Sequence, residues 1–226
     1  MNTAILVDGA FYRRRAYIAL GDITPEERAA ELVSYCRRHL SWEKDKPAEL
    51  YRIFYYDCPP LNKQIYHPLL QKNINLSKTD TYKWANEFYE ALKTKRKVAL
   101  RMGEVSAVTA TYTLKKNVLL QLMRNVKSID ELTEDDFIFH AEQKGVDIKI
   151  GIDIASLAYK KQVNQIVLIS GDSDFVPAAK LARREGIDFI LDPLYSNIKP
   201  SLFEHIDGLR TCDKAFQKSN NPNDQV

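Results

Sequence analysis

Short apolar segments, each bounded by turn-forming residues, are spaced along the chain. Residues 4–7, 165–169 and 187–191 are apolar without polar alternation, which is typical of strands buried on both faces of a parallel sheet. Residues 51–56 and 97–102 are two further predicted strands, the first because it is rich in aromatic residues.

Helices are predicted between these strands. Residues 24–27 (TPEE) have the order of a capping residue, a first-turn proline and acidic first-turn residues, so a helix is expected from there to about residue 39. Residues 150–161 and 175–184 have apolar residues at helical spacing. Alternating strands and helices predict an α/β fold, in which helices cover both faces of a central, mainly parallel sheet.

The middle of the chain, about residues 58–143, follows a different pattern. Its clearest elements are predicted helices at 81–92 and 114–126. We interpret this region as a helical elaboration of the sheet within a single domain of residues 1–217. Residues 218–226 are polar and rich in helix-breaking residues, and they are predicted to form a flexible tail.

Composition and charge narrow the class of protein. The 226 residues are 45% hydrophobic, which is enough for a packed core, and the net charge of +3 neither requires nor excludes a nucleic-acid partner. Cys36, Cys58 and Cys212 are far apart and form no CxxC pair, which favours a reducing compartment over a disulfide framework or a cysteine zinc site. The apolar segment at 4–7 is too short for a signal peptide or a membrane span, so we expect a cytoplasmic protein without membrane contact.

Aspartates follow several of the predicted strands. Asp8 comes directly after the first strand, Asp57 after the aromatic strand, and Asp172 and Asp174 after the strand at 165–169. Ligands of open parallel sheets bind beyond the carboxyl ends of the strands, so these carboxylates are expected at one edge. An aspartate between a strand and a helix is often only an N-cap, which is the alternative for Asp8 and Asp174. Two caps do not explain Asp172 and Asp174 together, because close like charges repel unless a cation lies between them.

A further carboxylate, Asp153, is the only acidic residue in the apolar segment 150–159. If a helix begins near Ile150, Asp153 lies in its first turn, where compensation of the helix dipole is the alternative role. Oxygen ligands without histidine or cysteine suit Mg²⁺ or Mn²⁺. Such ions activate water and stabilise charge on phosphate, so the pattern indicates hydrolysis of a phosphodiester or a phosphomonoester.

Three motifs occur in a familiar order: ILVDGAFY at the start, KGVDIKIGIDIASLAY in the middle, and VLISGDSDFVPAAKLARREGI near the end. In these motifs the chain resembles the NYN domain family of the PIN-like nuclease superfamily, nearest to its bacterial LabA-like branch. The resemblance implies a Rossmann-like, three-layer PIN fold and RNA cleavage that depends on Mg²⁺ or Mn²⁺. It implies catalytic and metal-binding roles for Asp8, Asp153, Asp172 and Asp174, and outer-shell roles for Asp147, Asp57 and Ser170. Ala10 and Phe11 depart from the family pattern, because many members carry an asparagine near the first aspartate.

Basic and aromatic residues near the motifs are candidates for contact with RNA, most naturally a single strand. They are Arg13, Arg14, Arg15, Tyr12 and Lys144. The alternative is that the basic residues form a solvated face and that the tyrosine packs inside. A homo-oligomer is compatible with the sequence.

Two other functions are weighed against a nuclease. A phosphatase of the haloacid dehalogenase type needs a second aspartate two residues after the first, and Ala10 occupies that position. A catalytically quiet PIN-like module that binds RNA or protein for regulation stays open. GxGxxG, Walker-type and GxSxG motifs are absent from the sequence, so it gives no motif for dinucleotides, nucleoside triphosphates or a serine hydrolase.

Overall fold

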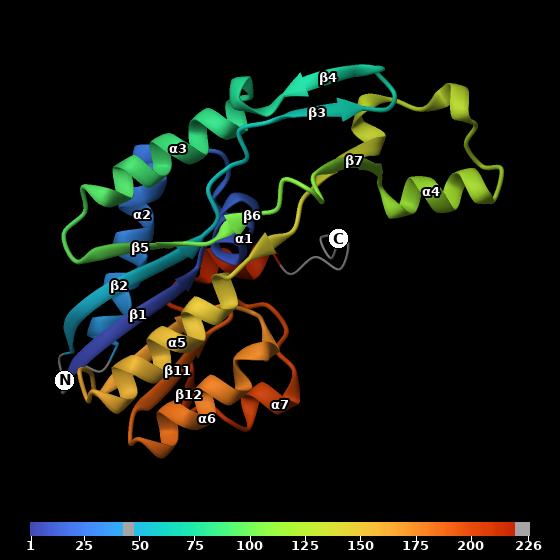
Figure 1. Ribbon diagram of the computed structural model, residues 1–226. Helices are drawn as coiled ribbons and strands as arrows, with labels where there is room; N and C mark the ends of the chain where they lie inside the picture. Colours follow the sequence, from blue (N-terminus) through green and yellow to red (C-terminus); the bar gives the residue numbers. More distant parts are fainter. Residues whose placement is uncertain (43–47, 220–226) are drawn as a thin grey trace. The chain divides into compact units, whose positions relative to one another are not determined.

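The computed structural model describes residues 1–42 and 48–219, and the predicted tail beyond Ser219 lies outside them. Its centre is a six-stranded sheet with the order β12-β11-β10-β1-β2-β5, in which every pairing is parallel (Figure 1). The strands are β1 (Asn2–Asp8), β2 (Glu49–Asp57), β5 (Val98–Met102), β10 (Gln165–Ile169), β11 (Asp188–Asp192) and β12 (Gly208–Leu209).

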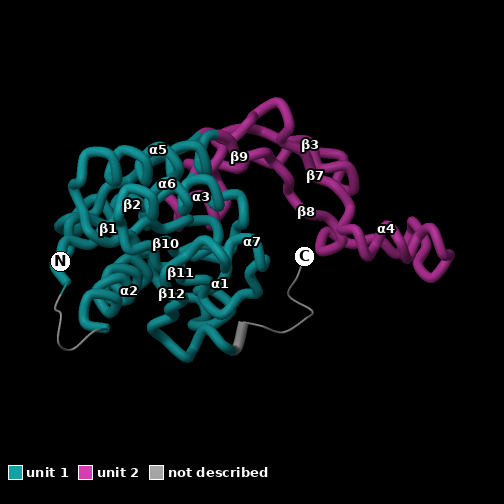
Figure 2. Tube along the Cα trace, turned by 90° about the horizontal axis from the view of Figure 1, so that it is seen from below, with its two compact units in different colours: residues 1–57, 87–103, 145–226 teal, residues 58–86, 104–144 magenta. Residues whose placement is uncertain are grey.

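Helices cover both faces of this sheet. Figure 2 shows α1 (Gly9–Leu20) and α2 (Pro25–Arg38) on one face, and α5 (Val146–Tyr159) and α6 (Val176–Arg184) on the other. The three-layer α/β fold predicted from the sequence is therefore confirmed. A short helix, α7 (Pro200–Phe203), precedes β12.

Burial explains why the strands form where they do. Residues 4–7 of β1 are fully buried, and so is all of β10, as expected for the middle of a doubly covered sheet. Helix α2 begins with a capping box, because the Thr24 hydroxyl accepts from the Glu27 amide at 3.3 Å and the Glu27 carboxylate accepts from the Thr24 amide at 3.0 Å.

Two neighbouring tyrosines of β2 connect the sheet to its opposite layers. The Tyr55 hydroxyl donates to Asp57 at 3.0 Å, and its ring packs edge-on against Phe88 of α3 (Asp80–Lys93), with centroids 5.6 Å apart. The Tyr56 hydroxyl donates to Asp153 of α5 at 2.8 Å. Alternating strand side chains point to opposite faces, so each tyrosine serves one layer.

Two helices differ from the sequence prediction, one in its first residue and one in that it was not predicted. Helix α5 begins at Val146 rather than near residue 150, after Gly145, whose positive φ of 82° suits glycine. Asp147 therefore lies in the first turn, and Asp153 lies almost two turns further on. Helix α1 was not predicted, because three consecutive arginines interrupt its apolar pattern.

The chain divides into two compact units (Figure 2). Unit 1 contains the sheet and comprises residues 1–57, 87–103 and 145–226; unit 2 comprises residues 58–86 and 104–144. Whether the two units form a single domain stays a prediction.

Unit 2 was predicted to be a helical elaboration, but it also contains short antiparallel strands. Its antiparallel pairs are β3 (Gln64–His67) with β4 (Lys72–Asn75), β6 (Glu104–Val105) with β9 (Gln143–Lys144), and β7 (Thr111–Leu114) with β8 (Phe137–His140). The predicted helices correspond to α3, which begins in unit 2, and α4 (Lys116–Met123). Buried His67 packs at 4.6 Å from the ring of Tyr112 and at 5.0 Å from that of Phe137.

Single turns of 3-10 helix complete the described elements. They are η1 (His39–Ser41), η2 (Leu76–Lys78), η3 (Ile129–Glu131), η4 (Glu134–Asp136), η5 (Ser173–Phe175) and the longer η6 (Lys214–Ser219). None of the helices within residues 1–42 and 48–219 is both long enough and apolar enough to cross a membrane.

A buried carboxylate, Asp192 at the end of β11, joins three parts of unit 1. One oxygen accepts from the Tyr35 hydroxyl of α2 and lies 2.9 Å from His39 Nε2. The other accepts from the Thr211 hydroxyl at 2.7 Å and from the Leu194 amide at 2.9 Å. Burial and the Asp192 carboxylate raise the pKa of Tyr35, which keeps this donor protonated.

Asp192→Ala should lower the free energy of unfolding by about 3 kcal/mol, because it leaves several buried donors without an acceptor. Urea unfolding measures this change, with Asp22→Ala as the exposed control. Equal effects of the two substitutions would show that the buried network contributes little.

Candidate functional site

The parallel register brings three sequence-distant segments to one edge of the sheet. Val7 of β1 pairs with Ile169 of β10, so Asp8 and Ser170 follow these strands side by side. On the other side of β1, Asp8 pairs with Tyr56, directly before Asp57. The expected convergence of Asp8, Asp57 and the loop at 170–174 is thus set by hydrogen bonding between the strands.

Asp8 is the N-cap of α1 and is largely buried. Its Oδ1 accepts from the Phe11 amide at 3.1 Å, and its Oδ2 accepts from the Ser170 hydroxyl at 3.2 Å. Burial raises the pKa of Asp8 from 3.8 to about 6, and the carboxylates of Asp147 and Asp57 add to the rise. Within the described residues, no lysine, arginine or histidine forms an ion pair with Asp8.

Two glycines allow the chain to approach closely around Asp8. A Cβ at Gly9 would lie 2.6 Å from both the Tyr55 ring and the Tyr56 carbonyl oxygen, and one at Gly171 would lie 2.7 Å from the Phe11 ring. The glycine after each strand-end position is therefore required by packing. The ring of Phe11 therefore packs directly against the backbone of Gly171.

The loop after β10 is held by its own polar groups. The Asp172 amide donates to the Ser170 hydroxyl at 3.2 Å, and Asp172 Oδ1 accepts from the Asp174 amide at 3.0 Å. Asp172 is thereby the N-cap of η5, while Asp174 is exposed. Ser170 connects the loop to Asp8, which fits the supporting position expected for it.

Asp147 is the carboxylate of α5 that belongs to this cluster. Its pKa is raised, first by partial burial and then by the negative charges of Asp172 and Asp174. Asp147 in turn raises the pKa of Asp8. Mutual repulsion of this kind links Asp8, Asp147, Asp172 and Asp174 in one acidic field, which we call the acidic cluster.

Asp153, a candidate ligand from the sequence, is engaged elsewhere. Its Oδ2 accepts from Arg101 Nε at 2.9 Å and from the Tyr56 hydroxyl at 2.8 Å. The early start of α5 explains the difference, because it places Asp147 rather than Asp153 in the first turn. These contacts with Arg101 and Tyr56 join Asp153 to β2 and β5.

Asp57 is at the predicted edge but has its own cation. It is fully buried and forms an ion pair with Arg13 of α1 at 2.9 Å, while accepting from the Tyr55 hydroxyl. Its charge is therefore compensated, and Asp57 positions α1 against β2. Sequence alone gave no signal for this pair, because 44 positions separate its members.

The residues predicted to contact RNA have different surroundings. Tyr12 is fully buried and donates to Glu31, and Arg15 is buried and donates to the carbonyl oxygens of Leu194 and Phe216, so neither side chain faces a ligand. For these two residues the interior alternative holds. Arg13 is partly exposed beside Asp57, and Arg14 is exposed. Lys144 is exposed in unit 2, where it lies 3.9 Å from Glu142.

The acidic cluster can be tested for its fit to a divalent metal. No three carboxylate, histidine or cysteine side chains within residues 1–42 and 48–219 form a ready-made metal site. Mg²⁺ is nevertheless commonly held by one or two carboxylates, with water and substrate phosphates completing its coordination. Asp8 is partly buried, lies beside other carboxylates and has no ion pair within residues 1–42 and 48–219, so it has the oxygen chemistry and the charge that fit such an ion.

Comparison with known proteins identifies the family to which the chain belongs. The family model described as the NYN domain matches residues 73–199, which include Asp147, Asp153, Asp172 and Asp174 but not Asp8. No curated protein matches the chain.

Two solved structures have a low overall likeness to the chain. A crystal structure of a protein of unknown function from Vibrio parahaemolyticus is 13% identical with a TM-score of 0.45, and the match covers 95% of this chain and 94% of that one. A maltogenic α-amylase from Thermotoga neapolitana is 9% identical with a TM-score of 0.22, over 92% of this chain and 48% of that one. Neither likeness is high enough to support an argument about function.

The raised pKa of Asp8 predicts a pH-dependent effect of Asp8→Asn. A carboxyl group with a higher pKa in the folded state favours folding when protonated, and this contribution is lost as the pH rises from about 4 to about 6. Asparagine removes the charge and can still cap α1. In EDTA, we expect the variant to be more stable than the unaltered protein by about 2 kcal/mol at pH 8, with a gain that shrinks as the pH falls toward 4.

Urea unfolding across this pH range measures the gain, and Asp22→Asn on an exposed loop is the control. A gain that does not change with pH would contradict the raised pKa.

Proposed function

Because the chain belongs to the NYN domain family of the PIN-like superfamily, whose members are generally nucleases, we propose that it is a metal-dependent ribonuclease. Its substrate would be single-stranded RNA, and its centre the acidic cluster of Asp8, Asp147, Asp172 and Asp174. The proposal replaces Asp153 of the sequence prediction by Asp147, because Asp153 is paired with Arg101.

The observation that carries this proposal is the state of Asp8. Its carboxylate is partly buried near other carboxylates and has no cationic partner within the described residues, whereas Asp57 beside it has one. A fold that keeps such a charge uncompensated loses stability, and this loss is expected where the charge serves function. A bound cation would remove the repulsion.

Mg²⁺ or Mn²⁺, when bound by these carboxylates, would supply activation of water and stabilisation of phosphate charge. The residues of the chain have separate tasks. The Ser170 hydroxyl and the Phe11 amide orient the two oxygens of Asp8, and the η5 cap fixes the backbone of Asp172. The Asp57–Arg13 pair holds α1, and with it the cap at Asp8, against the sheet.

Arg14, and Arg13 in part, would meet the phosphates of a bound strand, because these residues follow Asp8 on α1 and reach the surface. Lys144 stays a candidate contact within unit 2. The free state of Cys36, Cys58 and Cys212 supports the proposal of a cytoplasmic location.

A second candidate is a regulatory module that binds RNA without cleaving it. The lack of a ready-made three-ligand group within the described residues favours this alternative. Binding without turnover in the presence of either metal would support it.

Purified protein should cleave labelled single-stranded RNA with Mg²⁺ or Mn²⁺, and EDTA should abolish the cleavage. The double variant Asp8→Asn/Asp172→Asn should lose activity by on the order of 10²-fold or more, as expected when groups that hold the metal and the attacking water are removed. Gel analysis of products from RNA and matched DNA measures the activity and the substrate class. Cleavage that persists in the double variant would place the activity elsewhere or in a contaminant.

Two substitutions on α5 separate the sequence prediction from the structure. Asp147→Asn should lower kcat by on the order of 10²-fold and leave stability almost unchanged. Asp153→Asn should mainly lower the unfolding midpoint, because it weakens a partly buried pair with Arg101 and Tyr56. Kinetics and thermal unfolding of both variants give the comparison, and the reverse pattern would restore Asp153 as the metal ligand.

A further inference from the structure

A second feature lies at the opposite edge of the sheet from the acidic cluster. The C-terminal half of α6 and the segment before β12 enclose an open pocket of about 730 Å³, lined among others by Lys180, Arg184 and His205. The pocket borders residues 186–188, where β11 begins, whereas the acidic cluster follows the ends of the strands. Both features belong to unit 1.

The carboxylates of this pocket already have partners. Asp207 accepts from Arg183 Nε at 2.8 Å and from the Phe189 amide at 2.9 Å. Asp188 accepts from Gln165 Nε2 at 2.6 Å. Both carboxylates therefore already accept hydrogen bonds from the protein, and Arg183 lies between Asp207 and the Glu204 carbonyl oxygen.

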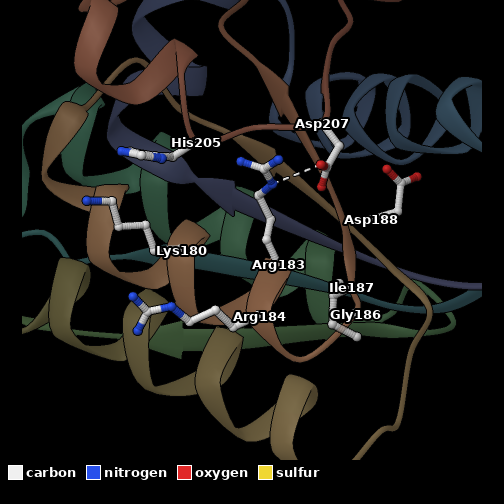
Figure 3. A pocket seen from close by; sticks show the side chains of 8 residues that line it. All are labelled: Lys180, Arg183, Arg184, Gly186, Ile187, Asp188, His205 and Asp207. Atoms are coloured by element: carbon white, nitrogen blue, oxygen red, sulfur yellow. Dashed lines mark hydrogen bonds and ion pairs between the residues drawn. The ribbon is translucent and has the colours of Figure 1, made fainter.

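The other basic side chains of the lining are those of Lys180, Arg184 and His205. Figure 3 shows the nitrogen-bearing ends of Lys180, Arg184 and His205 on one side of the pocket, and the carboxylates of Asp188 and Asp207 on the other. Within the described part of the chain, the side chains of Lys180 and Arg184 have no hydrogen bond or ion pair. Because these basic groups are separated from Asp188 and Asp207, one side of the pocket carries positive charge.

The helix dipole alone does not explain this arrangement. A cation in the last turn of a helix is favoured by the dipole, which accounts for Arg184. Lys180 lies one turn earlier, and His205 comes from a different segment, the turn that follows α7. Three donors from two elements that meet at one hollow are typical of a site for an anion with several oxygens.

We propose that this pocket binds a phosphate group through Lys180, Arg184 and His205. The lining residues include no phenylalanine, tyrosine or tryptophan, so the site would recognise the phosphate group rather than a base. A compact phosphate compound and the backbone of a nucleic-acid strand offer the same chemistry. The proposal does not depend on the nuclease function, because it uses none of the residues of the acidic cluster.

The test is titration of the full chain with pyrophosphate, followed by calorimetry, and with a labelled oligouridylate, followed by fluorescence anisotropy. Both titrations are made in EDTA, so that metal-mediated binding at the acidic cluster does not contribute. The pocket variant is Lys180→Gln/Arg184→Gln. The control variant, Arg37→Gln/Lys160→Gln, removes the same charge from exposed positions at the C-terminal ends of α2 and α5.

We expect the pocket variant to bind at least one probe roughly tenfold to a hundredfold more weakly, because two charged hydrogen bonds are lost. The control variant should keep the original affinity. Loss of pyrophosphate binding would identify a compact ligand, and loss of oligouridylate binding alone would identify a strand backbone.

Equal affinities of the pocket variant and the unaltered protein for both probes would overturn the proposal. An equal loss in the control variant would also overturn it, because net charge would then explain the binding. Both variants change exposed side chains, so their unfolding midpoints should match that of the unaltered protein.

Discussion

The structure depends on how it treats carboxylates at the carboxyl edge of a parallel sheet. Register places Asp8, Asp57 and Asp192 at the ends of β1, β2 and β11, where each is wholly or largely removed from water. Burial of a charge is costly unless a partner compensates for it. Asp57 has Arg13, and Asp192 has hydroxyl, amide and imidazole partners. Within the described residues, the partners of Asp8 are two neutral donors. The carboxylate at the end of β1 is thus left without a compensating charge, whereas those at the ends of β2 and β11 are stabilised by their partners.

The stabilised carboxylates, Asp57 and Asp192, hold in place the elements around Asp8. Arg13 reaches Asp57 from α1, the same helix whose start is capped by Asp8, so the ion pair fixes the helix that orients the site. Asp192 anchors the far side of the sheet to α2. A rigid frame of this kind allows carboxylates to stay close to one another at a cost in stability, which is typical of sites selected for chemistry rather than for packing.

The sequence was informative where a pattern reflects burial. Continuous apolar segments located the sheet, and a capping box located α2. The pattern failed where charge interrupts it, as in α1, and where the first turn of a helix alternates apolar and charged residues, as in α5. The later start expected for α5 placed Asp153 in the first turn, a position that Asp147 occupies in the structure. The short strands of unit 2 were missed because four-residue segments carry too little periodicity to be distinguished from loops.

The candidate site could be predicted in part for the same reason. Asp8, Ser170, Asp172 and Asp174 follow strands directly, so topology alone brings them together. The interior roles of Tyr12 and Arg15 depend on Glu31, Leu194 and Phe216, and no local pattern reveals such partners. A run of three arginines contains three different environments, since a helix turns by about 100° at each residue.

The two tyrosines of β2 set a limit on how this chain can vary. Tyr55 serves the layer of α1 and α3, and Tyr56 serves the layer of α5. Gain or loss of one residue within the strand would turn each following side chain to the opposite face of the sheet. Asp57 would then face α5, and Asp153 would lose the hydrogen bond from the Tyr56 hydroxyl. Insertions and deletions should therefore be excluded from β2 even where single replacements are tolerated, and the length of this strand is a stricter requirement than the identity of most of its side chains.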